Sequence, residues 1–400
     1  MKNSFSRNMG RVWKKFRKQK SSLFALVFLV LLILAGLFSD FLASDQPIYQ
    51  RNESGFYLNP PIPWAPDQPD PLNRDFTGPF DEQKYKTSEN NIISSPLRYR
   101  HILGTDAVGN DLLSGLIHGA STSLKIGFLS MFIAGIIGLF LGSMAGYFGN
   151  DTLQLSRGSR WMTCIGLLMG LFWSLVSRKE NIKLALASGT WETTIQILIS
   201  LFIVIASVFI FFQLGKTFHF IPFFNKKSNF PLDDILQGFS GIFNAIPYLV
   251  LILAMVSIFH EKGIGIIVAI IGLTSWTGVY RLTRAELMRI RNLPYIEAAK
   301  VYGLSDLKII WKHAIPNAFT PVLVELTFLI PMAITTESSL SFLGIGMPDR
   351  IVTWGSLLNS GRQQFDAWWM VVFPGLALML TIMSFILVGE GIKKIHKKSV

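Results

Sequence analysis

The sequence predicts an all-α polytopic membrane protein. Half of the 400 residues are hydrophobic and only 16% are charged, which is too apolar for a soluble chain of this length. Apolar runs of the ~20 residues that a helix needs to cross a bilayer recur along the chain, and Lys and Arg cluster beside them. The net charge of +12 therefore reflects membrane topology, so we expect contact with lipid and no binding of nucleic acid.

The amino-terminal part predicts one span followed by a large external loop. Residues 1–22 are basic and are expected in the cytoplasm by the positive-inside rule, and residues 23–42 form the first span. This apolar run is longer than the hydrophobic region of a signal peptide, and no convincing cleavage site follows it. Residues 43–122 are polar and rich in Pro, Asp and Asn, so we expect them to face outward.

The second span is expected over residues 123–149. It carries Gly138, Gly142 and Gly146, and small residues at intervals of four line one face of a helix and allow another helix to approach closely. Two interpretations are open at this point. The face could pack against another helix of this chain, or it could pair with another subunit.

Residues 150–231 contain two further apolar runs. The loops around these runs all carry positive charge, so charge alone does not orient them. The later loop at 280–318 is basic and must be cytoplasmic. The two runs therefore contribute two crossings or none, and we expect two.

Residues 232–390 are expected to supply four more spans, and the basic tail 391–400 returns to the cytoplasm. Pro247, within the first of these spans, removes a helix hydrogen bond and predicts a kink. The expected total is eight spans with both termini cytoplasmic. The last four cover residues 239–259, 264–279, 319–340 and 368–388.

The cytoplasmic loop at 280–318 predicts a rigid helix–glycine–helix knob that is offered to a soluble partner. Glu297 complements the positive end of the first short helix. Ala298 and Ala299 keep one face of that helix small, so another surface can approach closely. Gly303 stands where a helix C-cap needs positive φ.

A second short helix is expected after this glycine. Ser305 is a suitable N-cap, the helix runs to about His313, and Pro316 ends it or opens the next span. The alternative is an amphipathic connector that lies on the membrane surface with its bases toward lipid headgroups. The spacing of Glu-Ala-Ala, Gly, Ile and Pro between two spans favours the knob.

Glu325 and Glu337 are the ionisable residues within spans that suggest a translocation path. Glu325 could instead bond a neighbouring helix or extend to the inner interface, whereas Glu337 is expected near the outer mouth. The six histidines lie in separate segments, so we expect no metal site, and no catalytic set or cofactor site emerges. The chain lacks a Gly-Lys-Ser/Thr phosphate loop, so ATP would be bound by a partner.

These features resemble one family, the ABC-importer permeases, and within it the C-type subunit of the dipeptide/oligopeptide importers and their nickel-importing relatives. The basic amino terminus with the first span, the segments His101–Asp111 and Glu337–Gly346, and the loop at 295–317 carry the match. That loop resembles the family's EAA loop, the ATPase-docking signature. The docking residues so implied are Tyr295, Glu297, Ala298, Ala299, Gly303, Ser305, His313, Ile315 and Pro316.

The resemblance implies a type I ABC-importer permease bundle of six helices, to which residues 150–231 add an inserted hairpin. It implies a bacterial plasma (inner) membrane, a second homologous permease subunit, two ATP-binding subunits and an external solute-binding protein. The chain would form half of a pore for peptides and would not itself be an enzyme. The sequence departs from the family pattern at Ile102, Asn110 and His313, where Pro, a basic residue and an apolar residue are more usual.

Two rival functions are less well supported. An ion-coupled secondary transporter should show internal repeats and paired carboxylates at mid-depth, and neither is found. An integral-membrane enzyme should show clustered His, Asp and Glu at a membrane face, which is also absent. Within the permease class, peptides, nickel and other small solutes all remain open, because substrate choice rests largely on the binding protein.

Overall fold

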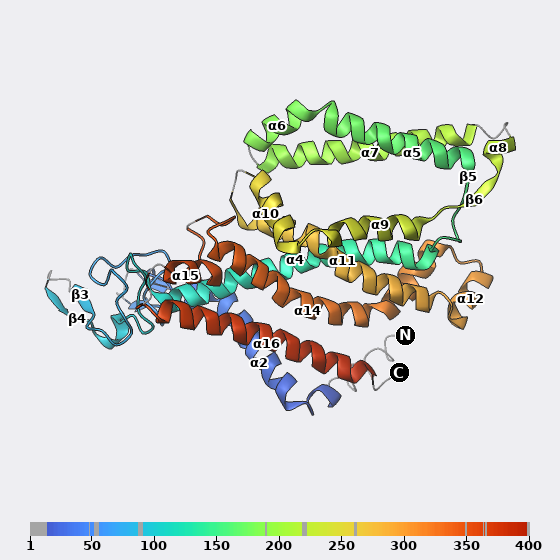
Figure 1. Cartoon of the computed structure of the whole chain (residues 1–400). Helices are drawn as coiled ribbons and strands as arrows, with labels where there is room; N and C mark the ends of the chain where they lie inside the picture. Colours follow the sequence, from blue (N-terminus) through green and yellow to red (C-terminus); the bar gives the residue numbers. More distant parts are fainter. Residues whose placement is uncertain are drawn as a thin grey trace. The chain divides into compact units, whose positions relative to one another are not determined.

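The structure is a computed structural model of the chain, and it is predominantly helical, as the sequence predicts (Figure 1). The first thirteen residues and the last three, which belong to the two expected cytoplasmic termini, lie outside the described residues. The structure describes residues 14–47, 49–51, 56–86, 91–188, 190–217, 222–259, 262–348, 350–362, 364 and 366–397.

Among the described residues, seven helices are long and apolar enough to cross a membrane, and a bent pair of helices supplies an eighth candidate. Each of the eight expected spans therefore has a helical counterpart. The seven are α2 (Lys20–Leu37), α4 (Leu112–Phe148), α5 (Arg157–Leu171) with the π-helical turn 172–176, α7 (Thr190–Thr217), α11 (Ile264–Ile290), α14 (Ile315–Phe342) with the turns at 306–314, and α16 (Trp369–Lys397). The bent pair is α9 (Leu232–Ala245) and α10 (Tyr248–Ile258).

The connections hold shorter helices and three two-stranded antiparallel sheets. The helices are α3 (Ser39–Leu42), α6 (Lys179–Ser188), α8 (Pro222–Asn225), α12 (Pro294–Val301), α13 (Asp306–Ile309) and α15 (Trp354–Gly361). The strand pairs are β1 (Tyr49–Arg51) with β2 (Phe56–Leu58), β3 (Lys84–Lys86) with β4 (Ile92–Ser94), and β5 (Gln154–Ser156) with β6 (Lys227–Asn229).

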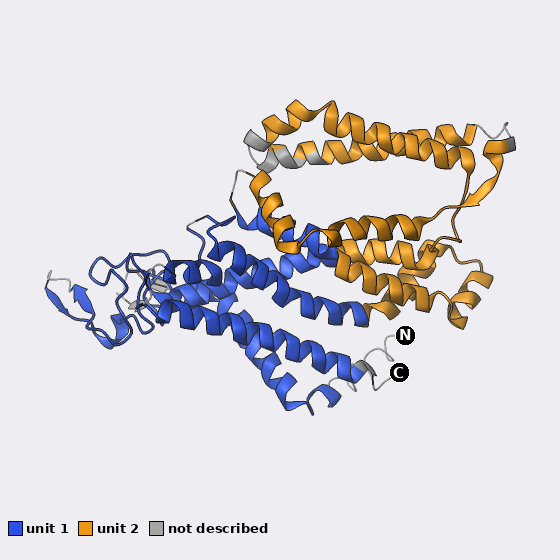
Figure 2. Cartoon of the chain, viewed as in Figure 1, with its two compact units in different colours: residues 1–135, 263–276, 321–400 blue, residues 136–262, 277–320 orange. Residues whose placement is uncertain are grey.

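The chain divides into two compact units (Figure 2). The first comprises residues 1–135, 263–276 and 321–400, and the second comprises residues 136–262 and 277–320. The first unit holds residues 43–111, the part of the predicted external loop that precedes α4, called the external segment below. The second unit holds the insertion and the predicted docking loop.

Helix α4 starts at Leu112, ahead of the span expected over residues 123–149. The carboxylate of Asp111 accepts the backbone N–H of Ser114 at 2.7 Å and so caps the helix. The 37 residues of α4 would extend about 55 Å, against a hydrocarbon core of about 30 Å. Helix α4 is therefore longer than one crossing requires, and the non-helical part of the predicted external loop ends at Asp111.

In the first unit, α2 packs on α16, and α15 packs on α4. The Ser22 hydroxyl donates to the Leu387 carbonyl at 2.8 Å, and a Cβ added to Gly391 would lie 2.7 Å from that same hydroxyl. Trp354 is fully buried, and its indole N–H donates to the Leu116 carbonyl at 3.1 Å. The Ser22 contact joins the amino-terminal part of α2 to the carboxyl-terminal part of α16, and the Trp354 contact joins α15 to the first turns of α4.

In the second unit, glycines of α4 pack directly on α11. A Cβ added to Gly142 would lie 2.7 Å from the Tyr280 carbonyl oxygen, and one added to Gly146 would lie 2.5 Å from that of Arg284. Such distances leave no room for a side chain. The glycine face therefore serves helix packing within this chain, the first of the two interpretations above.

The insertion folds as an antiparallel hairpin of α5 and α7. A Cβ on Gly166 would lie 2.7 Å from Cβ of Phe211, and Gly215 leaves no space for a Cβ against Ser159. The Ser207 hydroxyl donates to the Gly166 carbonyl at 2.8 Å. Strands β5 and β6 pair at the base of the hairpin. Both helices are long enough to span, and the two crossings stay a prediction.

Pro247 breaks its span and does not merely kink it. The axes of α9 and α10 differ by 87°, and Ile246 is extended, with φ −92° and ψ 131°. The proline ring excludes the helical region for the residue before it and removes one N–H donor. The first turn of α9 is fixed to α11, because the Arg284 guanidinium donates to both carboxylate oxygens of Asp233, at 2.5 and 2.6 Å.

Candidate functional site

The predicted docking loop begins with a short helix whose start follows from its sequence. Pro294 occupies the first helical position, where its missing N–H costs nothing. Glu297 lies in the first turn and its side chain is exposed, so it complements the helix dipole as expected. Ala298 is also exposed. Ala299 is buried, so it makes room for packing beneath the helix and does not face outward.

Gly303 ends this helix with φ +73°, as predicted. The backbone N–H of Leu304 donates to the Ala299 carbonyl at 3.2 Å, and that of Gly303 donates to the Lys300 carbonyl at 2.9 Å. This pair of bonds is a Schellman motif, which satisfies carbonyls that the helix end leaves free. Leu304 then packs against the buried cluster beneath the loop. The elbow is therefore defined by backbone geometry and not by a flexible hinge.

The second short helix does not end as the sequence predicted. Ser305 is at the N-cap position, but its side chain makes no capping hydrogen bond to the described residues. Helix α13 passes through a π-helical turn at 310–314 into α14 without a break. Pro316 lies directly after this turn, inside the continuous helix, so it does not end the second helix and stands where the next span begins, the second of the two roles predicted for it.

A hydrophobic cluster holds the loop against the ends of α4 and α11 within the second unit. From the loop, Ile296, Ile309 and Ile310 are buried at 2% exposure or less. Ile315 and Ala299 belong to the same cluster. The α4 and α11 residues that meet them are Tyr147, Phe148, Leu287 and Ile290. Burial of these large apolar side chains anchors the loop to the ends of α4 and α11.

Polar contacts add to this support. The hydroxyl of Tyr147 donates to the Asp306 carboxylate at 2.8 Å. The Lys300 ammonium lies 5.3 Å from the centre of the Tyr147 ring, within range of a cation–π contact. The Asn317 amide donates to the His313 carbonyl at 2.6 Å and to the Tyr295 hydroxyl at 3.2 Å. The loop thus brings Tyr295 and His313 together around Asn317.

The outward side of the loop carries large apolar side chains that the sequence-based site left out. Val301 and Tyr302 are each 87% exposed, and Trp311 is 60% exposed. Leu307 between them is also exposed. The signal was present in the sequence, since aromatic and branched residues are unusual in a polar cytoplasmic loop. Several large apolar side chains exposed on one packed loop favour an interaction surface there.

The two predicted path residues lie in different surroundings on α14. Glu337 is completely buried, and its carboxylate accepts hydrogen bonds from Ser341 at 2.7 Å and from Ser123 of α4 at 3.1 Å. Glu325 is half-buried and accepts no hydrogen bond from the described residues. The structure therefore does not bring these two carboxylates together.

The external segment contains a buried polar cluster that the sequence did not predict. His101 is fully buried, and its ring nitrogens lie 2.9 Å from an Asp111 oxygen and 3.3 Å from an Asp70 oxygen. Trp64 stacks on the imidazole at 4.4 Å. Burial alone would lower the pKa of His101, but the hydrogen bonds to the two carboxylates outweigh it and raise that pKa.

The same contacts change the pKa of Asp70 in the opposite direction. Burial would raise the pKa of Asp70, but hydrogen bonds from His101 and Asn73 lower it. Because the pKa of His101 is raised, its contribution to stability is complete below the unfolded pKa of 6.5 and is lost as pH rises through the folded pKa. Because the pKa of Asp70 is lowered, its contribution to stability is complete above the unfolded pKa of 3.8 and is lost as pH falls through the folded pKa. Both contributions are complete only between pH 3.8 and pH 6.5.

Two family models match the chain. One is described as "Binding-protein-dependent transport system inner membrane component" and covers residues 220–400. The other is described as "N-terminal TM domain of oligopeptide transport permease C" and covers residues 8–79. Most of the insertion lies between the two matched ranges.

Curated relatives give the same family. The oligopeptide transport system permease protein OppC of Haemophilus influenzae is 32% identical over 312 residues, which are 77% of this chain and 74% of the relative. The di/tripeptide transport system permease protein DppC of Pseudomonas aeruginosa is 26% identical over 382 residues, 95% of this chain and 89% of the relative. A peptide transport system permease protein of Brucella suis is 42% identical over 116 residues, 29% of this chain but only 39% of the relative.

The helical architecture, the matched ranges and the relative that is aligned over three quarters of this chain agree with one another. The chain belongs to the family of dipeptide and oligopeptide transport permeases, with the type I ABC permease fold.

Proposed function

We propose that the chain is a permease subunit of an ATP-driven importer of peptides. It would form half of the translocation pore, beside a second homologous permease subunit. The membrane is the bacterial inner membrane, with both termini of the chain in the cytoplasm. Two ATP-binding subunits would hydrolyse ATP, and a solute-binding protein would deliver substrate to the external segment. The relatives described above are peptide transport permeases, which supports this proposal.

The observation that carries the coupling part is the knob at 295–317. It offers exposed Val301, Tyr302 and Trp311 on a backbone that a Schellman elbow and a buried cluster hold rigid. A rigid knob transmits force, because a push on it displaces the helix ends beneath it and does not bend the loop. An ATPase pair that closes on nucleotide could in this way move α4 and α11.

The two glutamates of α14 take different roles in this proposal. Glu337 is enclosed by hydroxyl groups from α4 and α14, so it would hold those two helices together near the outer side. Glu325 accepts no hydrogen bond from the described residues, so it is the better candidate for the translocation path. The Glu337 carboxylate already accepts hydrogen bonds from the hydroxyl groups of Ser123, Ser338 and Ser341, so it has little to offer a passing solute.

Alanine substitution of the exposed aromatic residues tests the proposal. Tyr302→Ala and Trp311→Ala should each weaken binding of the ATP-binding subunits about tenfold or more, since exposed aromatic residues commonly dominate such interfaces. The measurement is copurification of the partners with the solubilised chain, followed by ATP-driven peptide uptake in vesicles. The chain purified alone should hydrolyse no ATP.

A matched control is Leu97→Ala, which removes a side chain that is 88% exposed in the external segment. This variant should bind the ATP-binding subunits like wild type. Wild-type partner binding by both aromatic variants would contradict the docking role and favour the surface-lying amphipathic connector. ATP hydrolysis by the pure chain would contradict the permease assignment itself.

A further inference from the structure

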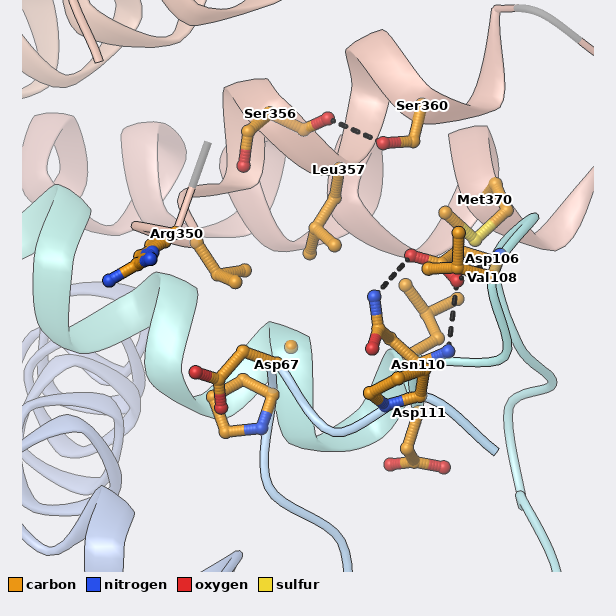
Figure 3. A pocket seen from close by; sticks show the side chains of 15 residues that line it. Asp67, Asp106, Val108, Asn110, Asp111, Arg350, Ser356, Leu357, Ser360 and Met370 are labelled. Atoms are coloured by element: carbon orange, nitrogen blue, oxygen red, sulfur yellow. Dashed lines mark hydrogen bonds between the residues drawn. The ribbon is translucent and has the colours of Figure 1, made fainter. Parts of the chain in front are cut away.

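Each of the two compact units contains a cavity. The one in the first unit lies where the loop at 66–69, the first turns of α4 and helix α15 meet, and Figure 3 shows the side chains that line it. Asp67 and Arg350 both border this cavity, so its charges have opposite signs and do not define a ligand. A cavity of the second unit is more selective, because its wall is almost wholly apolar.

This apolar cavity has a volume of about 410 Å³ and lies between the α5–α7 hairpin and the end of α10. The π-helical turn at 172–176 contributes Leu175 to the wall, α7 contributes Leu201, and the end of α10 contributes Ile258 and Phe259. All of the lining residues belong to the second unit. Single π-helical turns within α-helices frequently occur at functional sites.

The surface around the cavity is also apolar. Leu168 of α5 is 67% exposed, and Phe202 of α7 is 70% exposed. Leu175 and Leu201 of the cavity wall are exposed as well. A continuous apolar surface of this kind marks contact with a membrane or with another protein. Both helices of the hairpin are long and apolar enough to cross a bilayer, so in the predicted topology the cavity opens toward lipid.

The size of the cavity limits what can occupy it. One turn of an α-helix is about 10–12 Å wide and 5.4 Å high, which corresponds to roughly 420–610 Å³. The cavity of about 410 Å³ is therefore too small to enclose one turn of a partner helix. An acyl chain is narrower, bends to follow an irregular wall, and is the apolar material that surrounds a hairpin in a bilayer.

A cation is fixed at the edge of this cavity. Arg178 follows the π-helical turn, and its guanidinium donates to the Ser200 hydroxyl at 3.5 Å and to the Gln196 amide oxygen. Both acceptors line the cavity, so these bonds hold the guanidinium beside it. A guanidinium carries five N–H donors, more than these two contacts use. Its planar fork matches two oxygens of a phosphate group.

The position of Arg178 along the hairpin matches the depth of a lipid phosphate. The 20 residues from 157 to 176 rise about 30 Å, which equals the thickness of the hydrocarbon core of a bilayer. If the base of the hairpin lies at one membrane surface, Arg178 therefore lies at the other, among the headgroups. Residues 177–192 contain three bases and two acids, so their net charge also favours an anionic group.

We propose that this cavity binds one phospholipid, with an acyl chain in the cavity and the phosphate on Arg178. The acyl chain would lie against Leu175, Leu201 and Phe259, and the guanidinium would donate to two phosphate oxygens. This inference goes beyond the proposed function, in which the insertion has no role, and it rests on the two crossings expected of the hairpin. The lipid would fill the space between the hairpin and α10 and so join the insertion to the permease core.

A pair of lipids tests this assignment. The full chain is delipidated in detergent, and its binding of phosphatidylglycerol and of diacylglycerol with the same acyl chains is measured by native mass spectrometry. The two lipids differ in the phosphate headgroup, which only the first carries. Phosphatidylglycerol should bind about tenfold or more tightly, since hydrogen bonds between charged groups are among the stronger ones. Equal affinity for the two lipids, or no binding of either, would overturn the proposal.

Removal of the guanidinium places the phosphate at this cavity. Arg178→Gln should weaken binding of phosphatidylglycerol about tenfold and leave binding of diacylglycerol unchanged. Lys216→Gln is the matched control, because it removes one exposed positive charge at the other end of α7, and it should bind both lipids like wild type. Unchanged phosphatidylglycerol affinity in Arg178→Gln, or an equal loss in Lys216→Gln, would contradict the assignment.

A second pair of variants tests the acyl chain and does not depend on charge. Leu201→Trp enlarges a side chain of the cavity wall and should weaken binding of both lipids several-fold. Leu198→Trp is its control, since Leu198 is equally on α7 and exposed but does not line the cavity. Both positions are exposed, so neither change should disturb folding. Wild-type lipid affinity in Leu201→Trp would show that the chain does not enter this cavity and would remove the proposal.

Discussion

Replacing Gly303 with valine should weaken binding of the ATP-binding subunits and leave the membrane-spanning helices folded. Gly303 has φ +73°, and a Cβ there would meet no atom within 4 Å. The cost is therefore conformational and not steric. It amounts to about 1–2 kcal/mol for an ordinary residue and more for a β-branched one. A loss of that size shifts the population of the native elbow by a factor of about 5–30.

A graded series makes this prediction specific to backbone conformation. Asparagine tolerates positive φ better than other residues, so affinity should fall in the order Gly, Asn, Ala, Val at position 303. The assay is titration of the nanodisc-embedded chain with its ATP-binding subunits. Gly241→Val, in α9, is the control, because a Cβ there also meets nothing within 4 Å and φ is not positive. Wild-type affinity of Gly303→Val, or equal losses for Asn and Val, would refute the reasoning.

Two further predictions concern the external segment and the insertion. Hydrogen exchange of the external segment, corrected for intrinsic rates, should be slowest near pH 5, where protonated His101 and ionised Asp70 both stabilise it. It should speed up as pH rises from 6.5 through the raised pKa of His101, and His101→Asn should abolish that rise; a flat profile in the wild type would contradict the pKa direction. For the insertion, single cysteines are placed in a Cys164→Ser background. A cysteine at position 181 (Asn181→Cys) should react with a thiol reagent added outside, and one at position 225 (Asn225→Cys) should react only from inside. Labelling of both from the same side would exclude two crossings.

The sequence predicted the spans well because each is a long apolar run, and length and hydropathy alone decide whether a helix can cross a bilayer. Helix ends were predicted less well. Residues 112–122 are mixed in polarity, so only the capping bond of Asp111 shows that α4 starts there. The break at Pro247 was predicted as a kink, because proline identity does not reveal whether neighbouring helices will support the freed backbone groups.

For the docking loop, the sequence predicted the local backbone geometry but not which side chains face inward. Positive φ at Gly303 follows from local chemistry and was correct. The inward direction of Ala299 and the outward direction of Tyr302 depend on which face of a short helix meets α4 and α11. That choice arises from tertiary packing, which spacing within one segment does not encode. The contact between Tyr147 and Asp306 joins residues far apart in the chain and had no local signal.

The pairing of β5 with β6 has a consequence for how the insertion came to be tolerated. Residues 154–156 run antiparallel to residues 227–229, and paired strands lie only about 4.8 Å apart. The two ends of the insertion therefore lie next to each other, and the packing of Gly166 of α5 against Phe211 of α7 lies within the insertion itself. Such a segment can be inserted or removed as one unit. Joining the two strands by a tight turn would delete it without moving the helices on either side, so a host protein could gain or lose it in a single event.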